Sequence, residues 1–364
     1  MNRWTLPGPA SFLDGVVEAL RDGSNVAIAV PANAVPDLAP TLDYRLGDEG
    51  FRLSRISDPT DELPIDALYS QLDFDTAQPT IRTVASLLAN LSDKAVLFID
   101  SVRPENWTAW KGFLDDYASA SRSIGVFDRS QILLIARGVP LSQFVSKAPA
   151  LERFVWDGQI SEADVLSYIL HSQRKAGSAM NLHARLCSRI ISRICSWDID
   201  LVDRMISLSW HELFDPYSAL EAIASTEGVQ YPTAPSWEEG GISTIDGEQV
   251  KHALCIWKSG DPSGELRMRL WAAQAGELLP LLELKRRKLA ECVGATRKIP
   301  TTATLNGDGV RDLQEVELGG LLHLARVYKL PEDIVRSLSK LRDLRNKLAH
   351  LTPISADEAA NLLA

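Results

Sequence analysis

One short stretch near the C-terminus places an arginine, an asparagine and a histidine where they can act together. Arg345, Asn346 and His350 lie at the end of a helix predicted over residues 331–349, in the sequence LRDLRNKLAH. At 100° per residue, Arg345 falls inside the apolar stripe of this helix, where a guanidinium is costly unless it is paired or faces a wet cleft. Asn346 precedes His350 by four residues, a spacing that permits a hydrogen bond orienting the imidazole. The pattern therefore predicts a cleft beside an orientable histidine.

A second candidate is a contiguous run of four cations at Lys285, Arg286, Arg287 and Lys288. Residues 256–364 hold 17 Lys/Arg against 14 Asp/Glu and carry +3, whereas the remainder of the chain carries −13. The net charge of −10 argues against a general polyanion binder, since phosphate contacts need a local excess of Lys and Arg. The run is therefore either a solvated helix face or a phosphate-facing patch confined to the C-terminal part.

The first half of the chain has the pattern of a parallel α/β sheet. Short apolar runs of the kind that form strands buried on both faces occur at residues 25–30, 95–99 and 131–136, the first and last of them opening on a single amide residue. Stretches with helical periodicity lie before and between them, at residues 11–22, 81–91 and 107–120. Strands that alternate with helices indicate a parallel sheet covered by helices.

The order of these elements resembles that of P-loop ATPases of the AAA+ and STAND types. The run VLFID ends in Asp100, as a Walker B strand ends in its acidic residue, and QILLIARGVP resembles the sensor strand that follows. The first strand, however, leads into PANAVPDLAP, which has no glycine to wrap a phosphate and three prolines that lack an amide. No lysine precedes Lys94, and Ser101 follows Asp100 where many AAA+ proteins have a catalytic glutamate. We therefore expect a degenerate ATPase-like domain that does not hydrolyse ATP.

The remainder of the chain is predicted to be largely helical. Residues 161–170 begin with an S-x-x-D capping pattern, and residues 227–249, rich in Gly, Pro, Ser and Glu, are interpreted as a linker. Helices are then predicted over residues 265–293, with a kink at Pro280, and over 311–328, 331–349 and 355–363. The fold class expected is thus α/β plus all-α, with an ATPase-like domain over residues 1–160, a helical region and linker over 161–255, and a helical bundle over 256–364.

The C-terminal motif carries a second family resemblance. LRDLRNKLAH resembles the R-x4–6-H signature of HEPN domains in its common form R-N-x-x-x-H, and LQEVELGGLLHLARVYKL resembles the helix that precedes it in HEPN domains of the Swt1 type. The similarity covers roughly residues 262–364. It implies that Arg345 binds the phosphate and stabilises the transition state, that His350 is the general acid/base, and that Asn346 positions the histidine.

The resemblance also implies an activity and its partners. HEPN nucleases cleave RNA without a metal or other cofactor, because the 2′-hydroxyl is the nucleophile, and they usually pair two bundles around one cleft. The expected function is a conditional RNA endonuclease of a prokaryotic antiviral defence or toxin system, restrained or triggered through its N-terminal domain. RNA is expected to bind the basic run, and the partner is expected to be either a second copy, through the bundle, or a protein of the same defence system. The alternative is a non-catalytic adaptor in a multi-protein defence complex.

Other candidate sites are excluded by their spacing. The remaining histidines show no metal-binding pattern, and His323 is expected to be a partly buried structural residue. Four cysteines form no CxxC pair, which favours a reducing cytoplasm, and no run is apolar enough for a signal peptide or a membrane span.

Overall fold

The computed structural model describes residues 2–56, 63–72, 81–91, 95–125, 128–144, 150–175, 181–226, 231–232, 234–296, 304–305, 308–309 and 312–364. The chain forms two units. The first comprises Met1–Tyr168, Ser196–Ile199 and Ala224–Cys255, and the second comprises Ile169–Cys195, Asp200–Ile223 and Ile256–Ala364. Each unit is therefore assembled from segments that are separated in the sequence.

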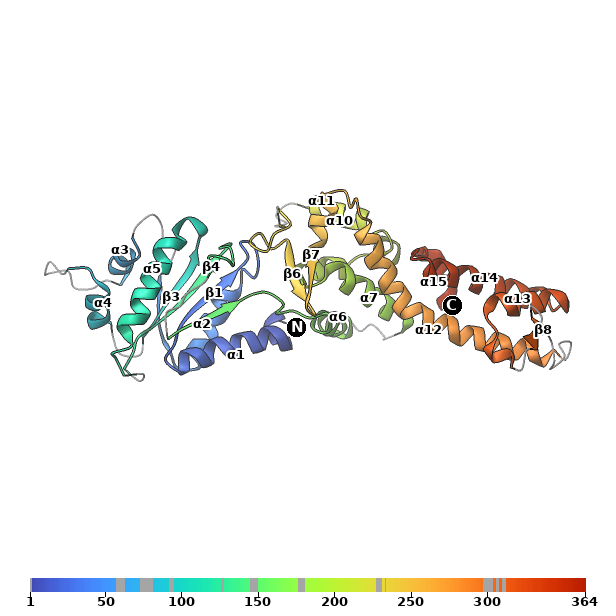
Figure 1. Cartoon of the computed structure of the whole chain (residues 1–364), viewed down its shortest axis with the longest axis horizontal. Helices are drawn as coiled ribbons and strands as arrows, with labels where there is room; N and C mark the ends of the chain where they lie inside the picture. The colour runs from blue at the N-terminus through green and yellow to red at the C-terminus, as the bar shows by residue number, and fades with distance from the viewer. Residues whose placement is uncertain are drawn as a thin grey trace. The chain divides into compact units, whose positions relative to one another are not determined.

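A five-stranded parallel sheet organises the first unit (Figure 1). Its strands are β1 (Asn25–Val30), β2 (Arg52–Ile56), β3 (Ala95–Val102), β4 (Gln131–Arg137) and β5 (Leu151–Val155), in the spatial order β2-β3-β4-β1-β5. The three central strands are buried on both faces, as their continuous apolar runs require. The predicted parallel α/β sheet of the N-terminal part is confirmed.

Helices cover both faces of this sheet. Alternate residues of the strands, such as Leu97 and Leu134, pack with buried side chains of α3 (Pro64–Gln71), α4 (Val84–Asn90) and α5 (Pro104–Ser121). The intervening strand residues point to the opposite face, where α1 (Pro7–Arg21) and α2 (Leu38–Asp48) lie. The first unit is thus a three-layer α/β structure whose core lies on both sides of the sheet.

The first unit also contains a hairpin of β6 (Ile242–Ile245) and β7 (Glu248–Lys251). Its two turn residues, Asp246 and Gly247, both have positive φ, which is the geometry of a tight two-residue hairpin turn. The strand β6, the turn and the start of β7 fall within residues 227–249, so the interpretation of that whole stretch as a linker is wrong.

The second unit is helical. A set of shorter helices comprises α7 (Leu182–Cys195), α8 (Ile199–Ile206), α9 (Trp210–Leu213) and α10 (Pro216–Ala224), with α6 (Glu162–Lys175) and α11 (Ala253–Lys258) each divided between the two units. The C-terminal helices are α12 (Glu265–Ala295), α13 (Leu318–Val327), α14 (Glu332–Ala349) and α15 (Ala356–Leu363), and α12 continues through Pro280. All four lie where the sequence predicts helices, and α14 packs against both α12 and α13.

Several local signals are confirmed in atomic detail. Ser355 and Glu358 form the capping box of α15, and Ser161 and Asp164 exchange the corresponding hydrogen bonds before α6. Helix α1 begins at Pro7 rather than after Ser11, because prolines are tolerated in the first turn. Short 3-10 segments occur at η1 (Arg3–Thr5) and η2 (Leu313–Glu315), and a small β8–β9 pair joins Thr304–Leu305 with Asp308–Gly309.

Candidate functional site

The end of α14 carries the three residues of the C-terminal motif on an exposed surface. Leu338, Leu341 and Leu348 of this helix are buried, as its apolar stripe predicts. Arg345 is not buried with them: its side chain is 46% exposed and its Nη2 lies 3.5 Å from Oε2 of Glu317. The projection of α14 places Arg345 beside these leucines, and the structure gives it both an exposed side chain and the carboxylate of Glu317 as a partner. The cleft expected beside it stays a prediction.

His350 is fixed by its backbone and free at its side chain. It is the C-cap of α14, and its N–H donates to the carbonyl oxygens of Asn346 (3.0 Å) and Lys347 (3.2 Å). Leu351 follows with φ +57°, so the chain turns away from the helix immediately after the histidine. Within the described residues, no side-chain hydrogen bond joins Asn346 to the imidazole, and both side chains are exposed. The orienting role of Asn346 stays a prediction.

Helix α12 holds this helix end in place. The indole Nε1 of Trp271 donates to the carbonyl of Leu348 at 2.6 Å, which satisfies a C-terminal carbonyl of α14. Gln274, which is fully buried, accepts from the N–H of Ile354 (2.8 Å) and donates to its carbonyl (3.0 Å). The backbone on both sides of His350 is therefore anchored by buried hydrogen bonds, whereas the ring itself faces solvent.

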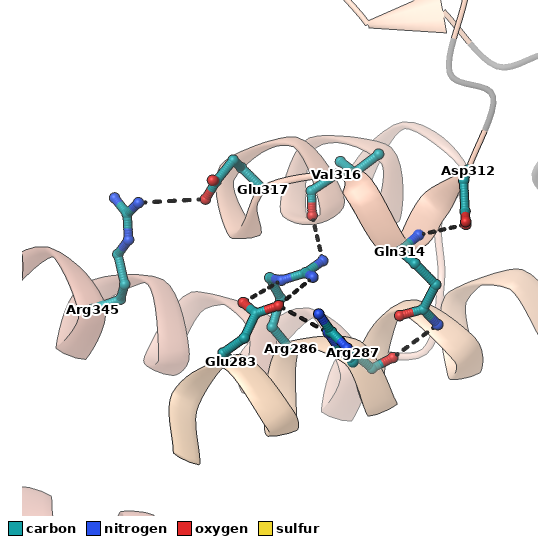
Figure 2. A network of polar contacts seen from close by, with 8 residues as sticks. All are labelled: Glu283, Arg286, Arg287, Asp312, Gln314, Val316, Glu317 and Arg345. Carbon is teal, nitrogen blue, oxygen red and sulfur yellow. Dashed lines mark hydrogen bonds and ion pairs between the residues drawn. The ribbon is translucent and has the colours of Figure 1, made fainter. Parts of the chain in front are cut away.

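A network of polar contacts ties the start of α13 to α12 (Figure 2). Arg286 is buried; it bonds both carboxylate oxygens of Glu283 at 2.7 and 2.8 Å, and its Nη1 donates to the carbonyl of Val316 at 2.9 Å. Glu317, the partner of Arg345, is the next residue after Val316 and the N-cap of α13. Hydrogen bonds from Arg286 lower the pKa of Glu283 to about 2. The network thus fixes the backbone from which Glu317 reaches Arg345.

The four cations of the basic run have different surroundings. Arg286 is occupied within the bundle, and Lys285 donates to the carbonyl of Leu362 at the end of α15. Arg287 is exposed and shares Glu283 at 3.1 Å, and Lys288 is exposed. Only Arg287 and Lys288 thus present exposed cations, and the RNA-binding role of the run stays a prediction. Two further cations close in sequence, Arg297 and Lys298, lie outside the described residues.

His323 is exposed, contrary to the sequence prediction. The sequence predicts a partly buried structural histidine, yet the structure places His323 on the exposed face of α13, with Leu322 and Leu324 buried on either side of it. The leucine spacing could have predicted this exposure. Leu321 and Leu324 are three residues apart and therefore share a face of the helix, whereas His323, directly before Leu324, points away from that face.

The carboxyl ends of β1, β3 and β4 form the second candidate site, because ligands of open α/β sheets bind at such strand ends. Arg137 ends β4 and donates to the Ala34 carbonyl in the β1–α2 loop (3.0 Å) and to Oγ of Ser101 (3.2 Å). Its Nε lies 3.8 Å from the carboxylate of Asp100. Burial lowers the pKa of the guanidinium, and the negative charge of Asp100 opposes that shift. A protein cation therefore links the loop after β1 to the Walker B-like aspartate.

The same loop is covered by the N-terminal residues. The buried Trp4 donates from Nε1 to Oδ2 of Asp37 at 2.8 Å, and the Arg3 guanidinium lies 3.5 Å from the same oxygen. Asp37 is the N-cap residue of α2, at the position where a phosphate-binding loop leads into its helix. Contacts within the chain thus engage both ends of the loop that lacks the glycines and lysine of a P-loop.

Ser101 is a functional signal that the sequence does not show. Its φ of +66° is in the left-handed region, which non-glycine residues seldom adopt, and the pairing of β3 with β4 shifts register between Ile99 and Val102. Backbone strain of this kind clusters at ligand sites. Among the described residues, no group of three or more His, Cys, Asp or Glu side chains could hold a metal ion, and no helix has the length and apolarity to cross a membrane.

Comparison with known proteins yields structural likeness only. No protein-family model matches the chain, and no characterised protein matches its sequence. The RuvB Holliday junction branch migration motor of Thermotoga maritima matches at a TM-score of 0.30 and 14% identity, over 69% of this chain and 93% of that chain. A chain of the Drosophila ORC complex with poly(dA/dT) DNA and Cdc6 matches at a TM-score of 0.27 and 12% identity, over 97% of this chain and 68% of that chain.

Proposed function

We propose that the chain is a conditional, metal-independent RNA endonuclease of a prokaryotic antiviral defence or toxin system, with its chemistry at the end of α14 and its control in the N-terminal domain. One observation carries the proposal: Arg345 and His350 occupy the same helix end with exposed side chains, while Trp271 and Gln274 anchor the backbone around them. A fixed backbone with accessible polar side chains is what a pre-organised site for a large substrate requires.

Arg345 would bind the scissile phosphodiester. Its guanidinium offers a planar fork that matches two phosphate oxygens. Its present partner, Glu317, is 77% exposed and 3.5 Å away, and exposed ion pairs of this kind contribute about 0–1 kcal/mol. A phosphate can therefore displace the carboxylate at little cost.

His350 would move the protons. The imidazole removes the proton from the RNA 2′-hydroxyl, the 2′-oxygen forms a bond to phosphorus, and the bond from phosphorus to the 5′-oxygen breaks, with a proton delivered to that leaving oxygen. The products are a 2′,3′-cyclic phosphate and a 5′-hydroxyl. Asn346 would orient the ring, and a second copy of the bundle would close the cleft that a single exposed helix end leaves open.

A non-catalytic adaptor is the second candidate, and one observation favours it. Lys285 and Arg286 are tied to backbone carbonyls within the bundle, which leaves fewer cations for phosphate contacts than the sequence offers. In that case the exposed end of α14 is an interaction surface and the histidine has no chemical role.

The test is cleavage of total RNA by the purified full chain, with and without cell extract as a source of the trigger, and with the cut ends mapped. His350→Ala is expected to lower the rate by about 10²–10⁴, the usual range for general acid/base catalysis, and Arg345→Lys is expected to fail because an ammonium lacks the bidentate fork. His323→Ala is the matched control, since His323 is an exposed histidine on the neighbouring helix. Equal activity of the His350→Ala and His323→Ala variants would reject the nuclease in favour of the adaptor.

A further inference from the structure

A cleft of about 300 Å³ opens at the carboxyl ends of β2 and β3 in the first unit. It is lined by Arg55 and Ile56 from the end of β2, by Phe98, Asp100 and Ser101 from β3, and by Arg103 at the start of α5. The proposed function does not use this cleft, and of its lining residues only Asp100 and Ser101 belong to the candidate site at the ends of β1, β3 and β4. Its volume is within the range of small-molecule sites, and its position at strand carboxyl ends is where α/β sheets bind ligands.

The two arginines of the cleft differ in how they are held. Arg55 bonds the carboxylate of Asp43 at 3.0 and 3.2 Å, and its guanidinium lies 5.5 Å from the centre of the Phe98 ring, so it is fixed in place. Arg103 is exposed, and within the described part of the chain no carboxylate pairs with its guanidinium. It is also the N-cap residue of α5, where the helix dipole adds positive potential. The cleft therefore presents one arginine fixed by an ion pair and one exposed arginine.

The lining of the cleft also includes an acceptor. Oδ1 of Asp100 accepts from the Ser101 hydroxyl at 3.0 Å and lies 3.8 Å from Arg137, which fixes the carboxylate. Within the described residues, Oδ2 of Asp100 has no hydrogen-bond partner, and the side chain is 40% exposed. A carboxylate oxygen in this state accepts from a hydroxyl or an amine of a ligand, as an acidic residue in an α/β fold accepts from a ribose hydroxyl. Ile56 and Phe98 also line the cleft and form its apolar wall.

We propose that this cleft binds a pentose phosphate monoester, either a free sugar phosphate or a nucleoside monophosphate. Arg103 and Arg55 would hold the phosphate, Asp100 would accept from a sugar hydroxyl, and the apolar wall would contact the carbon face of the sugar. Ser101, with its positive φ near the end of β3, would contribute by donating a hydrogen bond from its hydroxyl to Asp100, which holds that carboxylate in place. The proposal concerns the first unit and does not depend on the nuclease chemistry of the second.

Binding is measured on the full chain by isothermal titration calorimetry and thermal shift, with inorganic phosphate, ribose, ribose 5-phosphate, AMP and UMP as probes. We expect ribose 5-phosphate to bind at least tenfold more tightly than inorganic phosphate and ribose to give no binding. If the nucleoside monophosphates bind at least tenfold more tightly than ribose 5-phosphate, the natural ligand carries a base; equal affinities indicate the sugar phosphate.

Variants decide whether the ligand lies in the cleft. Arg103→Ala is expected to weaken binding of ribose 5-phosphate by about tenfold or more, the loss of one charge-assisted hydrogen bond, without a change in melting temperature, because its side chain caps no helix. Arg122→Ala, at the other end of the same helix, is the control and is expected to bind as the wild type does. Asp100→Asn is expected to weaken ribose 5-phosphate but not inorganic phosphate. No binding of any sugar phosphate, binding of inorganic phosphate alone, or equal affinities of the Arg103→Ala and Arg122→Ala variants would overturn the proposal.

Discussion

Replacement of Arg286 by alanine is the sharpest test of how the basic run is used. Arg286 is 8% exposed and donates to the Val316 carbonyl and to both oxygens of Glu283 (Figure 2). Loss of a charged donor to a buried carbonyl costs about 1.5–3 kcal/mol. The pair with Glu283, whose side chain is 47% exposed, adds about 0–1 kcal/mol. We therefore expect Arg286→Ala to lower the free energy of unfolding by about 1.5–4 kcal/mol.

The control for this prediction is the adjacent residue. Arg287 is 61% exposed and shares the same carboxylate, so Arg287→Ala removes an equal charge and is expected to change the free energy of unfolding by about 0.5 kcal/mol or less. Urea denaturation gives the difference, and hydrogen exchange of the amides of α13 reports whether the loss is located where Val316 leads into that helix. Equal destabilisation by the two variants, or unchanged exchange in α13, would refute the structural role assigned to Arg286.

Two further predictions address charge and nucleotide chemistry. Because the folded pKa of Glu283 lies near 2, below its ordinary value of 4.5, the stabilisation from this carboxylate is fully present above about pH 4.5 and is lost as the pH falls towards 2. The difference in unfolding free energy between wild type and Glu283→Gln should therefore shrink as the pH falls across that window. A difference that does not change with pH would contradict the low pKa of Glu283. The loop after β1 lacks the glycines and lysine of a P-loop, and Arg137 bonds its backbone. The full chain is therefore expected not to hydrolyse ATP, and Mg²⁺ is expected not to change its melting temperature in the presence of ATP. Phosphate release that Asp100→Asn abolishes would contradict this expectation.

The sequence predicts the central strands well and the edge strands poorly. The strands β1, β3 and β4 are continuous apolar runs because both of their faces are buried. The edge strands β2 (RLSRI) and β5 (LERFV) carry charged residues on exposed positions, so no apolar run marks them. The β6–β7 hairpin could have been predicted from the Asp-Gly pair between ISTI and EQVK, because Asp-Gly is typical of a two-residue hairpin turn. The composition of the surrounding stretch, taken alone, indicated a linker.

The residues of the candidate sites show why a helical projection is not sufficient. The projection places Arg345 beside the leucines of α14 correctly, but it does not show that α13 begins at Leu318 and leaves this position uncovered. For Arg286 the signal was present, since Leu282, Arg286 and Ala290 follow each other at four-residue spacing and all three are buried. The contiguous charge of the run concealed that one of its members faces the core. The cleft beside β3 was not predictable, because Arg55 and Arg103 come together only through the sheet.

The proline within α12 has a mechanical consequence. Pro280 has no amide proton, so the Gly276 carbonyl lacks its usual donor within a helix that is about 46 Å long at 1.5 Å per residue. The bending stiffness of a helix comes from its ladder of hydrogen bonds, and it is therefore lowest at the missing one. Next to Gly276, the carboxylate of Glu277 forms ion pairs with Arg185 (2.8 Å) and Arg189 (3.1 Å) of α7. The position at which α12 bends most easily is thus next to the position at which ion pairs hold it to α7. Any bending of the C-terminal half of α12, which carries Glu283 and Arg286, therefore occurs about the contact with α7.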